Sequence, residues 1–377
     1  MYKHFHRLAW LAFALATVVI VFGAFVRLSD AGLSCPDWPT CYGRAAWPTQ
    51  ADPAAHLEEA GRAFARPVET HKAWREQLHR HLAATLGLGV LALALLAARR
   101  RRFGMAAVVG ASVLVAAAIP LYMQGAHVAA SLLAGLGELI LVVAALRWSN
   151  ADLSRVAALT LAVIVFQALL GMWTVTWLLK PIVVMGHLLG GLATFSLLAF
   201  MAWRATAGSM LVQADAPKLR RLLAIGLGLL VLQIALGGWT SANYAALACG
   251  TDFPTCAGQW WPQADWREAF VLWRGIGVDY EGGVLDGDAR VAIQMAHRLV
   301  ALLVFGHLLM VAVRLWRTPG LRPWGTALAV LLVAQVALGI SNVHFGLPLA
   351  VAVAHNAGAA ALLFVVVSLL TRLRTPQ

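Results

Sequence analysis

The chain has 377 residues, of which 61% are hydrophobic and 12% are charged, and its mean hydropathy is +0.76. Soluble domains carry about twice that charged fraction, so the composition excludes a disordered chain, a fibrous protein and an ordinary soluble enzyme. Lysine and arginine number 29 against 17 aspartates and glutamates, which gives a formal charge of +12. The basic excess lies in short clusters between apolar stretches, a placement that is typical of membrane orientation and argues against nucleic acid as a partner.

Apolar stretches of about 20 residues recur along the chain, and each is long enough to cross a bilayer. They predict about ten transmembrane helices, at 8–28, 80–98, 103–122, 126–146, 156–177, 182–203, 221–241, 291–313, 324–343 and 349–371. The first stretch runs on without a small-residue cleavage site, so we expect a retained span in place of a signal peptide. Basic clusters at alternate ends predict that both termini are cytoplasmic and that the long loops 29–78 and 242–290 lie outside.

The sequence also repeats itself, which indicates a duplicated architecture. Gln167-Ala-Leu-Leu-Gly171 and Gln335-Val-Ala-Leu-Gly339 are each followed, twenty residues after the glutamine, by a histidine. In each half a His-Arg pair begins another helix, and a loop with two cysteines precedes that pair. The repeated groups are His187 with His355, His79-Arg80 with His297-Arg298, and Cys35/Cys41 with Cys249/Cys256.

The two copies differ by one insertion. His79 and His187 are 108 residues apart in the first half, whereas His297 and His355 are 58 residues apart in the second. The excess is long enough for two helices and a turn, and it corresponds to 101–150. We therefore predict an all-α polytopic membrane protein made of two four-helix bundles, residues 1–210 and 211–377, with the hairpin 101–150 inserted in the first.

Four histidines at matched depth near the outward ends of their helices are the main candidates for function. Ligating side chains inside a membrane are costly and are functional by default. Two facing helices that each present an imidazole form a cage for a six-coordinate heme iron, so four predict two heme sites, one in each half. The alternative is that they hydrogen-bond across helices without a metal. The four residues are His79, His187, His297 and His355.

Three charged residues next to these histidines are further candidates. Glu76 shares a helix face with His79 if that helix begins early enough, where it could act as a base or orient the imidazole. The alternative is a solvated carboxylate at a helix N-terminus. Arg80 and Arg298 could pair with heme propionates, or they could extend towards the membrane interface.

All four cysteines fall in the two long loops, in close local pairs. An even number on the oxidising side favours one disulfide in each loop, Cys35 with Cys41 and Cys249 with Cys256. Pairing between the loops and a redox-active dithiol are the alternatives. A zinc site is not expected, because no further ligand pair stands nearby at the required spacing.

Five segments resemble the heme A synthase family, and the resemblance covers nearly the whole chain except 101–150. They are Arg27-Leu-Ser-Asp-Ala-Gly-Leu-Ser-Cys-Pro-Asp-Trp-Pro-Thr-Cys41, Glu76-Gln-Leu-His-Arg80, Leu236-Gly-Gly-Trp-Thr-Ser-Ala-Asn243, Glu281-Gly-Gly-Val-Leu-Asp-Gly287 and Ala354-His-Asn-Ala-Gly358. The resemblance implies an oxidoreductase of the cell inner membrane. Such an enzyme oxidises the C8 methyl of heme O to the formyl of heme A, which serves terminal oxidases of the cytochrome c oxidase type.

The resemblance also implies roles for the residues. His297 and His355 would hold a resident heme b, with both heme sites towards the periplasmic side. His79 and His187 would frame the heme O substrate, with Glu76 at the acidic position implicated in catalysis. The implied partners are a heme O synthase that delivers the substrate, an electron acceptor such as a quinone, assembly factors of the terminal oxidase, and membrane lipids.

One competing function shares the four histidines. A di-heme b-type cytochrome could transfer electrons through the membrane without acting on heme as a substrate. It would not need a carboxylate beside His79, and hemes near opposite leaflets would suit it better, whereas all four histidines map to one leaflet. Formation of formyl-bearing heme discriminates between the two functions.

Overall fold

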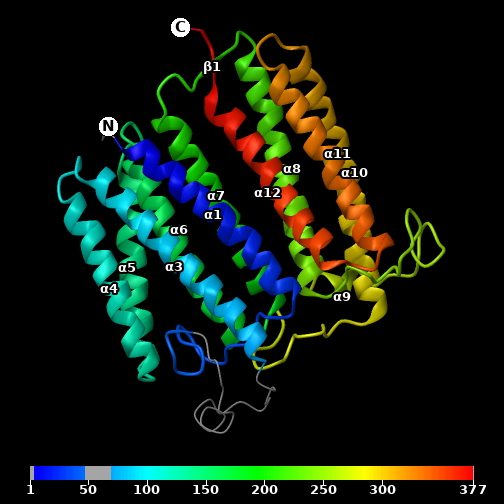
Figure 1. The fold of residues 1–377 in the computed structure, drawn as a ribbon, viewed down its shortest axis with the longest axis horizontal. Coiled ribbons are helices and arrows are strands. Elements are labelled where there is room, and N and C mark those ends of the chain that lie inside the picture. The colour runs from blue at the N-terminus through cyan, green and yellow to red at the C-terminus, as the bar shows by residue number, and fades with distance from the viewer. Residues whose placement is uncertain (1–3, 47–68, 377) are drawn as a thin grey trace. The chain divides into compact units, whose positions relative to one another are not determined.

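The structure is a computed structural model that describes residues 4–46 and 69–376 (Figure 1). Ten of its helices are long and apolar enough to cross a membrane, which confirms the predicted all-α polytopic fold. They are α1 (Phe5–Leu28), α3 (Thr70–Ala98), α4 (Gly104–Met123), α5 (His127–Arg147), α6 (Ser154–Thr176), α7 (Pro181–Ala205), α8 (Ala216–Ala242), α10 (Gly287–Arg317), α11 (Arg322–His344) and α12 (Leu349–Arg372). The other described elements are the short helix α9 (Trp266–Ala269) and the parallel strands β1 (Leu211–Val212) and β2 (Leu373–Arg374).

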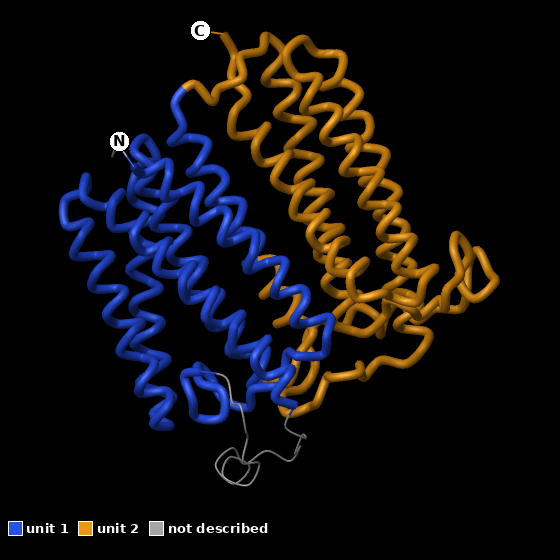
Figure 2. Tube along the Cα trace, viewed as in Figure 1, with its two compact units in different colours: residues 1–176, 190–207 blue, residues 177–189, 208–377 orange. Residues whose placement is uncertain are grey.

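The chain divides into two compact units, residues 1–176 with 190–207 and residues 177–189 with 208–377 (Figure 2). In the second unit α8, α10, α11 and α12 form a four-helix bundle, in which α10 and α12 each pack on both α8 and α11. In the first unit α3 packs on α1 and α6. The C-terminal part of α7 packs on α1, where Trp10 lies edge-on to Trp203 and donates a hydrogen bond to Thr206.

The inserted hairpin is formed by α4 and α5, which pack closely on each other. Small residues allow this approach, because a Cβ atom at Gly137 would lie 2.8 Å from the Ala111 carbonyl oxygen. Helix α4 also contacts α3 and α5 contacts α6, while α3 and α6 still pack directly on each other. The insertion therefore adds two helices to the first unit without separating the core helices on either side of it.

Several helices begin earlier than hydropathy predicted, and α3 differs most. Helix α3 begins at Thr70 in place of residue 80, and α10 begins at Gly287 in place of residue 291. Hydropathy detects only the apolar part of a helix, whereas these first turns are polar and are held by local contacts. The Asp286 side chain, for example, caps α10 by accepting a hydrogen bond from the Ala289 N–H. Because α3 begins so early, Glu76 and His79 share one continuous helix.

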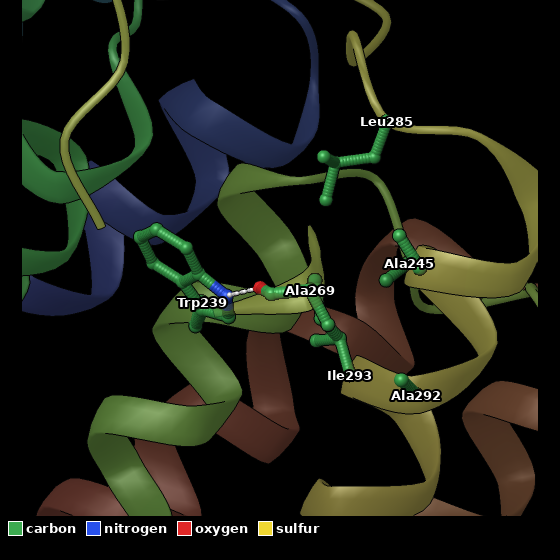
Figure 3. Packing of buried hydrophobic residues seen from close by; sticks show 7 residues of the cluster. Trp239, Ala245, Ala269, Leu285, Ala292 and Ile293 are labelled. Atoms are coloured by element: carbon green, nitrogen blue, oxygen red, sulfur yellow. Dashed lines mark hydrogen bonds between the residues drawn. The ribbon is translucent and has the colours of Figure 1, made fainter. Parts of the chain in front are cut away.

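A compact apolar cluster anchors the loop between α8 and α10 (Figure 3). Trp239 at the end of α8 is 3% exposed and packs with Leu285 and Ile293. Its indole Nε1 donates a 2.9 Å hydrogen bond to the carbonyl oxygen of Ala269 at the end of α9. One side chain thus provides both apolar packing and a partner for a loop carbonyl.

Replacing Trp239 by phenylalanine keeps an aromatic ring in the cluster but leaves the Ala269 carbonyl without its donor. We expect a loss of stability of about 1–3 kcal/mol, measured as a lower thermal midpoint of the purified protein in detergent. Trp260→Phe is the matched control, because Trp260 is 74% exposed. Equal midpoints for the two variants would contradict this role of Trp239 in the cluster.

Candidate functional site

The second unit holds two of the four predicted histidines in one bundle, each clasped by a glutamine from a neighbouring helix. Gln233 of α8 donates to the backbone carbonyl of His297 on α10 at 3.1 Å, and the same nitrogen lies 3.1 Å from the ring Nδ1. Gln335 of α11 donates to the backbone carbonyl of His355 on α12 at 3.0 Å. His297 and His355 are near enough to interact electrostatically. The second bundle thus presents two imidazoles from different helices.

Glycines on the neighbouring helices α8 and α11 make room for these imidazole rings, because they have no side chain. A Cβ atom at Gly237 would lie 3.2 Å from Cε1 of His297, and one at Gly339 would lie 3.1 Å from Cε1 of His355. The Nδ1 atom of His355 is buried and has no hydrogen-bond partner among the described residues. Two half-buried imidazoles from different helices, in an apolar bundle, are a donor set that fits a six-coordinate heme iron.

The first unit repeats only part of this arrangement. His79 of α3 packs against Gly23 of α1, where a Cβ atom would lie 2.7 Å from its Cε1. Val19 precedes Gly23 by four residues, at the position where Gln233 precedes Gly237, so the first half lacks that glutamine. His187 lies near the start of α7, in the segment 177–189 that belongs to the second unit.

Both cysteine pairs form the predicted local disulfides, Cys35 with Cys41 and Cys249 with Cys256. The arginines that follow His79 and His297 tie these disulfide loops to their helices. Arg80 donates to the carbonyl oxygens of Asp37 and Thr40 at 2.8 and 2.6 Å. Arg298 donates to the carbonyl oxygens of Asp252 and Thr255, both at 2.9 Å. These residues occupy matching places in the two repeats, and their binding of propionates stays a prediction.

Glu76 is 5% exposed, so it is not the solvated carboxylate of the alternative interpretation. It accepts a 2.9 Å hydrogen bond from the Cys35 N–H and forms a 2.5 Å ion pair with Arg80. Tyr42, next to the disulfide, is close enough for the carboxylate to affect it. Burial first, and then the charges of Glu76 and Asp37, raise the pKa of the Tyr42 phenol. The carboxylate, the arginine and the disulfide loop therefore form one cluster three residues from His79.

The second unit has no such acid at the matching place. Gln294 stands three residues before His297, as Glu76 stands before His79, and it is also buried. Ala257 follows Cys256, where Tyr42 follows Cys41. A titratable carboxylate and phenol at these places are thus specific to the first half.

Sequence reasoning missed the glutamine that holds His297. The signal was present, because Gln233-Ile-Ala-Leu-Gly237 is a third copy of the pattern found at 167–171 and 335–339. Only the structure shows what the pattern does, which is to place an amide on the histidine of the next helix and a glycine beneath the ring.

Comparison with known proteins decides the family. The model of the COX15-CtaA family, described as cytochrome oxidase assembly protein, matches residues 6–127 and 123–367. The chain belongs to the COX15-CtaA family. A heme A synthase of Shewanella oneidensis is 38% identical in a match of 369 positions that covers 96% of this chain and 96% of the relative. The heme A synthases of Methylobacterium radiotolerans and Paracoccus denitrificans are each 34% identical over 183 and 184 residues, 46% of this chain and 45% and 44% of theirs.

These matches confirm the resemblance drawn from the motifs. The Shewanella match extends over nearly the whole of this chain.

We call the hydrogen bonds from Arg80 and Arg298 to the carbonyl oxygens of the disulfide loops the arginine clamp. The clamp of the second half makes a prediction that is independent of any ligand. Arg298→Met leaves the carbonyl oxygens of Asp252 and Thr255 without their charged donors, and such bonds contribute about 1.5–3 kcal/mol each. We expect amide hydrogen exchange in 249–259 to accelerate about tenfold or more. Arg290→Met is the control, because Arg290 lies on the same helix outside the clamp. Unchanged exchange in Arg298→Met would contradict the clamp.

Proposed function

We propose that this chain is a heme A synthase, which oxidises the C8 methyl group of heme O to a formyl group. The observation that carries the proposal is the asymmetry of a duplicated site. Both halves supply histidines from matching helices, but only the first places a buried carboxylate, Glu76, three residues from its histidine. A protein that only transferred electrons between two equal hemes would not require this difference. The heme A synthases among its relatives support the same function.

We assign His297 and His355 to a resident heme b, which when bound would supply one-electron redox chemistry. Gln233 and Gln335 fix the helix positions from which the two imidazoles project. We assign His79 and His187 to the heme O substrate, and Arg80 and Arg298 to the propionates of the two hemes. The rings of His79, His297 and His355 each face a glycine, so a bulkier residue there would displace the ligand.

The reaction needs a base and an electron acceptor. With water as the oxygen donor, converting a methyl group to an aldehyde releases four protons and four electrons. Glu76 would accept protons near His79, and its contacts with Arg80 and the Cys35 N–H hold the carboxylate in place. The electrons need an acceptor of low polarity that can reach a membrane protein, and a quinone is the class we propose.

The partners follow from the same chemistry. Heme O is sparingly soluble in water, so we propose delivery within the membrane by a heme O synthase. The product would pass to assembly factors of a terminal oxidase of the cytochrome c oxidase type. We place the protein in the cell inner membrane, with both termini cytoplasmic and the two disulfide loops and the heme sites on the periplasmic side.

Expression of the chain together with a source of heme O should produce formyl-bearing heme A, detected by extraction and chromatography of the pigments. Glu76→Gln should lower the yield about a hundredfold or more, because an amide cannot accept the protons, while the resident heme stays bound. Glu69→Gln is the matched control, since Glu69 pairs with Lys72 at the start of the same helix. Formation of no heme A by the unaltered chain would overturn the proposed function.

The histidine assignments predict two classes of variant. His297→Ala or His355→Ala should lose the resident heme, because each removes an axial ligand of that site. His79→Ala or His187→Ala should abolish heme A formation and keep most of the resident heme. The heme content of the purified variants, from the absorption of their pyridine complexes, measures the difference. Loss of all heme from His79→Ala would refute this division of labour.

A further inference from the structure

Lys180 is a buried cation to which the proposed function assigns no role. It lies between α6 and α7, and its side chain has 0% relative exposure. The ammonium nitrogen sits 3.3 Å from the centre of the Trp273 ring and 5.3 Å from that of Trp177. It donates no hydrogen bond to any residue that the structure describes, and none of the ion pairs found in that part of the chain includes it.

Such a cation is incomplete without an anion. Contact with an indole face offsets part of the cost of removing an ammonium from water, but a buried charge is ordinarily paired as well. Burial also lowers the pKa of Lys180, which shows that its surroundings disfavour the charged form. A carboxylate or phosphate within hydrogen-bonding distance would reverse that tendency.

The backbone around Lys180 adds to the attraction for an anion. Its carbonyl oxygen accepts hydrogen bonds from the N–H groups of Val183 and Val184, at 2.9 and 3.1 Å, so Lys180 occupies the N-terminal capping position of α7. The N-terminus of a helix carries a partial positive charge and favours anions. The cation and the helix end therefore reinforce each other.

The position of Lys180 relative to His187 indicates which anion binds. His187 follows seven residues later, which is about two helical turns, or about 10.5 Å along the axis. Residues at this spacing lie on one face of a helix. The carboxylates of a heme lie at the edge of its ring, away from the iron. In the same way, Lys180 lies along the helix axis from His187, the residue that would hold the iron. At the matching place in the second half, seven residues before His355, stands Pro348.

We propose that Lys180 binds a propionate carboxylate of the tetrapyrrole whose iron is bound by His187. This inference rests on the proposed function, which assigns His187 to the substrate. It makes Lys180 a residue that positions the substrate in the first half, with no counterpart in the resident site. The ring would be fixed at two points on one segment, through its iron by the imidazole and through its carboxylate by the ammonium.

Two alternative roles for Lys180 would give different results. It could pin the turn structurally, since Trp177 packs edge-on against Trp273 and the Leu178 carbonyl accepts a 3.1 Å hydrogen bond from the Tyr280 N–H. It could instead bind the phosphate of a lipid headgroup. A structural pin would serve every ligand equally, and a lipid site would not respond to the propionates of a heme.

The test compares ferric heme b with its dimethyl ester, in which both propionates are blocked. The protein is purified with its resident heme, and binding of further heme is followed by absorption titration. We expect Lys180→Met to weaken binding of the free acid about tenfold or more, and to leave binding of the ester unchanged. Lys180→Arg should retain most of the preference for the acid. Lys72→Met is the matched control, an ion-paired lysine near the start of α3.

Three results would overturn the assignment of Lys180. They are equal weakening of acid and ester, unchanged binding of both, and a change confined to the amount of co-purified lipid. If the Lys180→Met variant fails to fold, Lys180→Gln provides a second variant. The thermal midpoints of the two variants show which of them is folded. If the unaltered protein binds no further heme and makes no heme A, the proposed function fails together with this inference. If it binds heme and only the Lys180 result is negative, this inference alone fails.

Discussion

A polar side chain within a bundle of apolar helices must find its partners inside the protein, because lipid offers none. In this chain, hydrogen bonds between neighbouring elements of the same half meet that constraint. In the second half a glutamine on one helix holds the histidine of the next, and in both halves an arginine beside a histidine holds two carbonyl oxygens of a disulfide loop. Each pairing joins one helix to a second element of its own half, so the polar groups that could serve the chemistry also fix where the helices and loops lie.

The duplication makes the differences between the halves informative. The two repeats share the disulfide, the arginine clamp and the glycine beneath the imidazole, which indicates that these features serve the structure common to both sites. The differences at matching places include Glu76 against Gln294, Lys180 against Pro348, and Val19 against Gln233. The first half gains an acid and a cation, whereas the second gains an amide clasp on its histidine. These differences accord with the proposal that the first half admits a substrate and the second retains a cofactor.

Much of the fold and part of the site follow from the sequence. Apolar stretches located ten spans, and the repeated motifs located the duplication, the hairpin and the four histidines, because these patterns depend on residues close together in the chain. The early starts of α3 and α10 escaped hydropathy, since their first turns are polar. The burial of Glu76 and the clasp of Gln233 on His297 depend on neighbours 41 and 64 residues away along the chain. The repeated pattern at 233–237 marks the glutamine, but it does not name the histidine that the glutamine contacts.

The hairpin of α4 and α5 shows why an insertion in a membrane bundle can leave a site intact. An even number of spans preserves the orientation of every later helix, so the motifs of α6 and α7 keep their place. Direct packing of α3 on α6 also persists beside the hairpin, and the hairpin contacts this pair through α4 and α5. The helix that carries Glu76 and His79 therefore keeps the same core neighbours that α10 has in the second half, the helix before its disulfide loop and the helix that follows in the repeat. The insertion thus leaves the helix that carries Glu76 and His79 packed on α1 and α6.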